Sequence, residues 1–323
     1  MFYDLMLKLN ETLTFNNIGF YVSHHFNYYN FIKSTPTFEK SEYNILKEWE
    51  IVNNSLKEEV NYHILTKYEK KLSGFNLWDS IVGDRHLYFG KRSTLFQHYK
   101  PRFNRDQMLK ILQGGLIEID DFLNKNKPDF IISYNSITFG ENLFYYFAKS
   151  LNIPFLNLRS LKIENHVVYG DTIHKHINEI SECYEKYMSA NEDNDWLDQA
   201  NNFIIKANNN EIRYEGIRKR DTRNKITLLI KGISSIPNRI KKEIIYYWRG
   251  FHRDNQSVDP LITDFYNKLI NPTRALLIDR KLSKQYIQEK KLSNLKYSFF
   301  PLHSEPEVSI MLHNKTYLNQ IEA

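Results

Sequence analysis

A histidine and two glutamates near the end of the chain are the residues whose types best suit chemistry. His303, Glu305 and Glu307 follow an apolar run, Tyr297 to Leu302, that is predicted to be a β-strand. They are therefore expected to crowd the carboxyl edge of a sheet. Carboxylates close together, or close to a histidine, have their pKa values pushed apart, which separates acid from base. The spacing indicates a functional acid–base site, with a structural role as the alternative.

A second polar group follows a compact apolar strand predicted over 130–133 and precedes a helix. It contains Ser136, Thr138 and Asn142, in the stretch YNSITFGEN. Doubly wound sheets bind ligands at this place, and helix N-terminal amides there can hold an anion. The turn carries no glycine-rich phosphate motif. These residues are interpreted either as caps and turn formers or as substrate contacts.

A third candidate is His24 in the stretch SHHFNYY. His24 and His25 point in opposite directions if the preceding strand continues, so one of them can face a cleft. The neighbouring Tyr28 and Tyr29 suit stacking on a sugar. The alternative is a solvated pair of loop histidines.

The elements that must position these residues alternate between strand and helix. Residues 18–23 predict a strand, and apolar spacing near 3.6 over 38–72 predicts helices. A further strand is predicted at 84–90. From 105 to 160 the order is helix, strand 130–133, helix 141–151 and a strand after Pro154, with one more strand at 166–171. This is a βαβ pattern, typical of a parallel sheet covered by helices on both faces.

Length and composition favour a globular chain of two domains, or of one large domain with a helical arm. It has 323 residues, of which 41% are apolar and 15% aromatic. The single cysteine, Cys183, cannot form an internal disulfide or a zinc site alone, which fits a reducing compartment. No signal peptide and no apolar run of membrane-spanning length is recognisable. We expect a cytoplasmic protein.

The net charge of +6 is concentrated in residues 218–253. Cations there are interleaved with isoleucine, leucine, tyrosine and tryptophan, as in interfacial helices whose lysines meet lipid phosphates. The segment predicts an anionic partner, which is a phosphate-bearing substrate, a lipid head group or nucleic acid, and its aromatic residues favour a membrane surface. An ordinary helix pair with a solvated face is the alternative. Nucleic acid is not expected, because no recognition motif is visible and Pro237 interrupts a long reading helix.

The terminal stretch YSFFPLHSEPEVS…YLNQIE resembles the YxxFPLHxQPEAS…xxDQ signature of bacterial capsule polysaccharide biosynthesis proteins. Those proteins are similar to glycosyltransferases of the GT-B type, which have two Rossmann domains. KPDFIIS and YYFAKSLNIPFLNLRSLKIENHVVYGD resemble the family's N-terminal βαβ unit more loosely. Glu305 stands where the family has Gln, and Val308 where it has Ala.

The resemblance implies a GT-B-like α/β fold in three parts. These are a Rossmann-like acceptor-side domain (1–215) with a parallel sheet and helices on both faces, a basic helical arm (216–292), and the first strand of a truncated nucleotide-sugar domain (293–323). The donor half is then missing, and we expect the chain to be inactive alone. The implied reaction moves sugar from a nucleotide-activated donor to a polysaccharide or lipid-linked acceptor, at the inner face of the cytoplasmic membrane. No cofactor or metal is expected, because helix dipoles and basic side chains can neutralise the donor diphosphate.

The resemblance also suggests roles for the candidate residues. His303 and Glu305 would line the cleft between domains, one of them as acid, base or hydrogen-bond partner to sugar hydroxyls. Glu307 would support them. Arg159, after the predicted strand PFLNL, is a candidate for gripping an acceptor phosphate or carboxylate.

Three other protein classes remain as alternatives. The first is a non-catalytic, membrane-peripheral scaffold of a polysaccharide assembly complex, which the basic aromatic segment supports. The second is a nucleotide-sugar epimerase, which would also need the missing donor domain. The third is a nucleic-acid-binding protein, which only the net charge supports.

Overall fold

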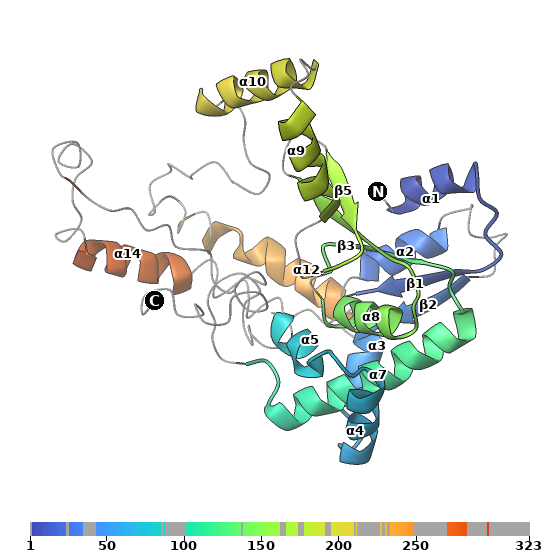
Figure 1. The fold of residues 1–323 in the computed structure, drawn as a ribbon. Coiled ribbons are helices and arrows are strands. Elements are labelled where there is room, and N and C mark those ends of the chain that lie inside the picture. The colour runs from blue at the N-terminus through green and yellow to red at the C-terminus, as the bar shows by residue number, and fades with distance from the viewer. Residues whose placement is uncertain are drawn as a thin grey trace.

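The protein was analysed as a computed structural model. It describes residues 2–23, 26–34, 43–84, 87, 101–136, 138–161, 166–173, 178–190, 195–209, 211, 227, 230, 233–248, 270–282 and 296. Within these parts the chain is a mixed α/β structure in which helices predominate (Figure 1).

Five strands are present in the described parts: β1 (Ile18–Val22), β2 (Tyr43–Lys47), β3 (Ile131–Tyr134), β4 (Phe155–Ser160) and β5 (Val167–Gly170). The N-terminal helices are α1 (Phe2–Asn10), α2 (Phe26–Ser34), α3 (Glu48–Ser55), α4 (Tyr62–Lys71) and α5 (Leu77–Gly83). The later helices are α7 (Arg105–Asn126), α8 (Phe139–Ser150), α9 (Asn178–Ala190), α10 (Asp195–Asn208), α12 (Ile236–Trp248) and α14 (Asn271–Leu282).

The described strands form two small sheets. β1 pairs with β2 in parallel, with Ile18 opposite Tyr43, and α2 lies between them in sequence. β3 pairs with β4 in parallel, with Ile131 opposite Phe155, and α8 connects them; β5 then adds to β4 in the antiparallel direction. Two βαβ units are therefore present, and the one predicted over 130–160 is confirmed. A single continuous Rossmann sheet is not seen among the described strands.

Helix α7 is the longest described helix, and its sequence explains both ends. Asn104 accepts the Gln107 N–H at 2.8 Å, and the Gln107 side chain accepts the Asn104 N–H at 3.0 Å, which is a capping box. At the other end Lys127 adopts a left-handed conformation with φ of 43°, and Pro128 follows. The chain is thereby turned directly into β3.

Two adjacent glycines let two other helices approach α7 closely. A Cβ on Gly114 would overlap Ser55 of α3, and a Cβ on Gly115 would overlap the ring of Phe139 at the start of α8. The GG pair in the middle of α7 is therefore a packing feature. It brings the beginning of α8 against the long helix.

The main core lies between α3, α4, α5, α7 and α8, which gather on one side of the sheets (Figure 1). Its largest fully buried side chains include Phe139, Phe147, Leu116 and Ile119. Val22 of β1, Ile32 of α2 and Trp49 of α3 form a smaller buried cluster. Most of the stabilising apolar burial is thus around α7 and α8, which flank β3.

The prediction that helices dominate 38–72 is confirmed by α3 and α4. Ile45 and Leu46, which were counted in the helical spacing, instead belong to β2, opposite Phe20 and Tyr21 of β1. A short apolar strand directly before a helix has too few residues to reveal a period of two. Of the strand predicted at 84–90, Asp84 follows α5 and Leu87 is helical, and the rest lies outside the described residues.

Other expectations along the chain have different outcomes. The strand at 18–23 is confirmed as β1, and the one at 166–171 as β5. The predicted strand Tyr297 to Leu302 lies outside the described residues, as does most of the chain beyond residue 211, so the domain boundaries stay predictions. Within the described parts no helix is both long and apolar enough to cross a membrane.

Candidate functional site

The turn between β3 and α8 is held by buried polar side chains. Asn135 and Ser136 both have positive φ, 61° and 42°. The hydroxyl of Ser136 lies 2.8 Å from that of Ser133 and donates to Asn157 Oδ1 of β4 at 3.3 Å. This bonding offsets the cost of placing a serine in the left-handed region. The turn is therefore fastened to both strands of the parallel pair.

Asn142 stabilises the same turn from within α8. Its side-chain amide donates to Thr138 O at 2.8 Å and approaches Ser136 O at 3.5 Å. Asn142 is completely buried, and its Oδ1 has no hydrogen-bond partner among the described residues. The structure thus brings Ser136, Thr138 and Asn142 together, and the bonds of Ser136 and Asn142 hold the backbone. Substrate contact by these residues stays a prediction.

The start of α8 is surrounded by three carboxylates. Glu141 accepts the Thr138 N–H at 3.0 Å, Asp84 accepts the Phe139 N–H at 3.0 Å, and Glu48 accepts the Gly140 N–H at 3.4 Å. The first amides of a helix have no partner within the helix and attract negative charge. Here the chain's own carboxylates take that place, so an external anion would have to displace them. The expectation that these amides hold a ligand anion is therefore not favoured.

Glu48 and Asp84 of this carboxylate cluster are both buried, each with 1% of its surface exposed. Burial raises the pKa of the Glu48 carboxyl group well above the usual range, and the nearby charges of Asp84 and Glu141 raise that pKa further. The Gly140 N–H and the Thr138 hydroxyl lower it by smaller amounts. Glu48 therefore holds its proton more tightly than an exposed glutamate does.

Two further residues complete the surroundings of the carboxylate cluster. The Tyr21 hydroxyl, on β1, donates to Glu48 Oε2. Burial lowers the pKa of the Arg102 guanidinium, and the charge of Asp84 opposes that change. An arginine therefore lies close enough to Asp84 to balance part of the negative charge. The cluster joins the carboxyl ends of β1 and β2 to the helix that follows β3.

Arg159 lies at the end of β4, half-buried, and its guanidinium donates to Thr172 O. The side chain of Asn157 donates to the same carbonyl at 3.2 Å and also receives the Ser136 hydroxyl. Ser136 and Arg159 are thereby linked through Asn157 and Thr172. Burial lowers the pKa of Arg159, and the nearby Tyr145 opposes this. Contact of Arg159 with an acceptor stays a prediction.

The remaining candidates cannot be placed. His24, His303, Glu305 and Glu307 lie outside the described residues. Within the described ranges, no group of three or more His, Cys, Asp or Glu side chains is arranged to hold a metal ion.

Sequence reasoning did not find the carboxylate cluster, because Glu48, Asp84 and Glu141 are far apart in the chain. One signal was present: Thr138 and Glu141 have the T-x-x-E spacing of a capping box, which marks the start of α8. A second signal is the place of Glu48 close to apolar Leu46 and Trp49, at the junction of β2 and α3.

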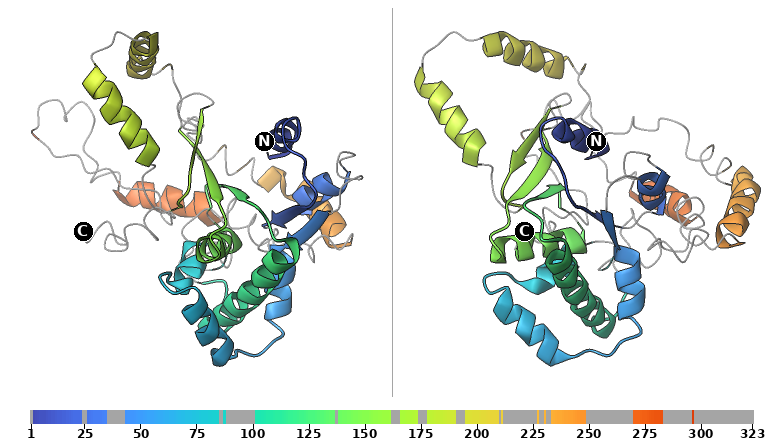
Figure 2. Two further views of the ribbon diagram at one scale, coloured as in Figure 1. Left: turned by 45° about the vertical axis from the view of Figure 1, so that its right-hand side comes forward. Right: turned by 90° about the vertical axis from the view of Figure 1, so that its right-hand side faces the viewer.

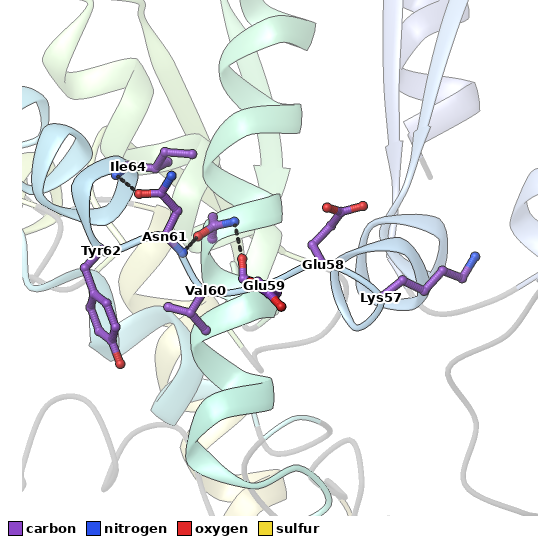
Figure 3. A pocket seen from close by; sticks show the side chains of 8 residues that line it. Lys57, Glu58, Glu59, Val60, Asn61, Tyr62 and Ile64 are labelled. Atoms are coloured by element: carbon purple, nitrogen blue, oxygen red, sulfur yellow. Dashed lines mark hydrogen bonds between the residues drawn. The ribbon is translucent and has the colours of Figure 1, made fainter.

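An open hollow of about 590 Å³ lies elsewhere, where the α3–α4 connection meets α7 (Figure 3). The side chain of Gln113 accepts the Asn61 N–H at 2.6 Å and donates to Glu59 O at 3.2 Å. Asn61 in turn caps α4 by accepting from His63 and Ile64. These bonds serve the connection between helices, and none of the sequence-predicted site residues lines the hollow.

Comparison with known proteins found no matching family model, no matching curated protein and no matching solved structure. The resemblance to capsule polysaccharide biosynthesis proteins therefore rests on the motif residues alone.

Proposed function

We propose that this chain is a glycosyltransferase-like protein of capsular or surface polysaccharide biosynthesis. It would transfer sugar from a nucleotide-activated donor to a polysaccharide or lipid-linked acceptor. The structural observation that carries the proposal is the β3–α8–β4 unit, whose parallel strands end in a buried polar turn. Ligands of doubly wound folds bind at this edge. The FPLHSEPE motif supplies the resemblance that narrows the chemistry to sugar transfer.

We infer that the two sheets belong to one Rossmann-like acceptor-side domain. Phe15, just before β1, and Phe130, just before β3, lie with ring centroids 6.4 Å apart. At the other end of the strands, Tyr21 contacts Phe144 of α8, with centroids 5.1 Å apart. The carboxyl ends of both parallel pairs therefore converge near the start of α8, as one parallel sheet would require.

The roles in this proposal divide between the two ends of the chain. His303 or Glu305 serves as acid or base, or binds sugar hydroxyls, and Glu307 supports them. Arg159, at the edge formed by the ends of β3 and β4, binds a phosphate or carboxylate of the acceptor. The amides of Phe139 and Gly140 have no ligand role here, because Asp84 and Glu48 already accept their hydrogen bonds.

A turnover assay tests the proposal. The full chain is incubated with a panel of uridine, guanosine, cytidine and thymidine nucleotide sugars and a bacterial membrane extract as acceptor, and nucleotide release is followed. The assay decides between turnover and the expectation that the chain is inactive alone. Release with at least one donor, mostly lost in His303→Ala and kept in His313→Ala, a histidine of the same stretch outside the motif, would show sugar transfer by this chain. Equal release from both variants would contradict the role of His303, and no release from any donor would leave the chain without sugar transfer of its own.

A second candidate function is a non-catalytic, membrane-peripheral scaffold. The observation that favours it is the exposed apolar face of α12, whose Ile240, Ile244 and Trp248 are all open to solvent. The scaffold predicts vesicle binding without nucleotide release. The turnover assay therefore separates the two functions.

A further inference from the structure

Helix α12 carries an apolar face that is open to solvent. One side of the helix is apolar because isoleucine and aromatic residues follow one another at helical spacing. Its members are Ile236, Ile240, Ile244, Tyr247 and Trp248. Ile240 is 45% exposed, Ile244 61% and Trp248 85%. Burying apolar side chains normally stabilises a folded protein, but these three stay exposed to water in the described fold.

Cations predominate among the charged residues of α12. Lys241 is exposed beside the apolar face, and Arg239 and Lys242 occupy helix positions outside it. Glu243, the single acidic residue within α12, stands three residues from Ile240 and four from Tyr247 and so occupies a position at the other edge of the face. An apolar stripe with tryptophan and tyrosine at one end and a cationic remainder is the arrangement of helices that lie in a membrane interface.

Helix α9 shows that exposed apolar residues alone do not lead to this conclusion. Ile180, Tyr184, Tyr187 and Met188 of α9 are also exposed. That helix, however, carries Glu179, Glu182 and Glu185 against a single lysine, Lys186. An anionic surface would repel α9 and attract α12. The positive charge of α12, and not its exposed apolar residues alone, therefore favours an anionic partner.

The position of α12 leaves room for a flat partner. In the right-hand view of Figure 2 the helix, drawn in light orange, lies at the edge of the molecule, clear of both sheets. We propose that the apolar face of α12 docks in the plane of an anionic lipid surface, with Ile240, Ile244 and Trp248 entering the interface. Lys241 then meets the lipid phosphates. This inference does not depend on sugar transfer, since a scaffold would use the same face.

Co-sedimentation with vesicles tests the proposal on the full chain. Vesicles of phosphatidylcholine alone are compared with vesicles that also contain phosphatidylglycerol. We expect binding to the anionic vesicles that weakens as salt is raised. Ile240→Ser/Ile244→Ser should weaken it by about tenfold or more. The matched pair on α9, Ile180→Ser/Met188→Ser, should leave it unchanged.

Charge-reversal variants and tryptophan fluorescence test the proposal in two further ways. Lys241→Glu should weaken binding to anionic vesicles, whereas Lys186→Glu on α9 should not. In the wild-type chain, vesicles with brominated acyl chains should quench part of the tryptophan fluorescence, and Trp248→Phe should remove that part. The quenching measurement does not depend on the folding of the isoleucine variants.

Three results would overturn the proposal. One is the absence of binding to anionic vesicles, and another is equal loss of binding in the α9 and α12 pairs. The third is a dimer in sedimentation velocity that Ile240→Ser/Ile244→Ser dissociates, without any vesicle binding. That result would assign the face to a second copy of the chain.

Discussion

The Tyr21 hydroxyl donates a hydrogen bond to the Glu48 carboxyl group directly beside Gly140. Tyr21 belongs to β1, Glu48 begins the helix after β2, and Gly140 lies in the first turn of α8. The contact thus joins one parallel pair to the helix that follows the other. It also places a hydroxyl and an amide on a carboxyl group that burial keeps from ionising at its usual pH.

The raised pKa of Glu48 predicts a pH-dependent effect of Glu48→Gln. Because the folded protein holds this proton more tightly than the unfolded chain, wild-type stability is favoured below the usual pKa of 4.5 and is lost as pH rises toward the folded value. The amide of the substituted side chain stays neutral, so the variant should gain stability relative to wild type over that range, by at most about 1.4 kcal/mol per pH unit.

Urea denaturation between pH 4 and 8 measures this difference. Glu69→Gln, on the exposed side of α4, is the control for the loss of a glutamate that is not buried. A Glu48→Gln difference that does not change with pH would show that Glu48 is ionised in the folded protein.

Gly140→Ala should disturb the contact between Tyr21 and Glu48. An added Cβ would overlap the Tyr21 hydroxyl and ring, so β1 or α8 must shift, at a cost of about 1–3 kcal/mol. Tyr21→Ala removes the obstructing side chain. In that background Gly140→Ala should cost less, and a double-mutant cycle from denaturant midpoints measures the coupling. Additive effects would mean that the two residues do not contact each other.

Asp120 on α7 should contribute more stability than its neighbour Asp121. Asp120 is buried and accepts hydrogen bonds from Lys71 Nζ at 2.6 Å and Tyr68 Oη at 3.1 Å. Asp120→Ala leaves both donors without this partner and should cost about 1–3 kcal/mol. Asp121 is exposed, so Asp121→Ala should stay within about 0.5 kcal/mol of wild type. Equal losses in the free energy of unfolding would contradict the burial of Asp120.

The βαβ unit around β3 was predictable because residues next to each of its elements mark where that element begins or ends. Pro128 and Pro154 precede short apolar runs, and Thr138 and Glu141 mark the helix between them. β2 was missed because its apolar residues pass directly into α3. Local patterns identify elements well when turn residues separate them, and poorly when they adjoin.

The candidate site was less predictable than the fold. The turn residues Ser136, Thr138 and Asn142 were expected together and do lie together. The carboxylate cluster depends on packing between distant segments, which no local spacing reveals. The hydrogen bonds from the first amides of α8 to Asp84 and Glu48 likewise follow only from the fold.

Direct binding of a nucleotide sugar is the measurement that tests the proposed function most closely. Saturation-transfer NMR with the full chain would report which protons of each donor touch the protein. The proposal predicts transfer to both the nucleotide and the sugar of at least one donor, weakened in His303→Ala and preserved in His313→Ala. If no nucleotide sugar receives saturation at millimolar concentration, sugar transfer by this chain is contradicted.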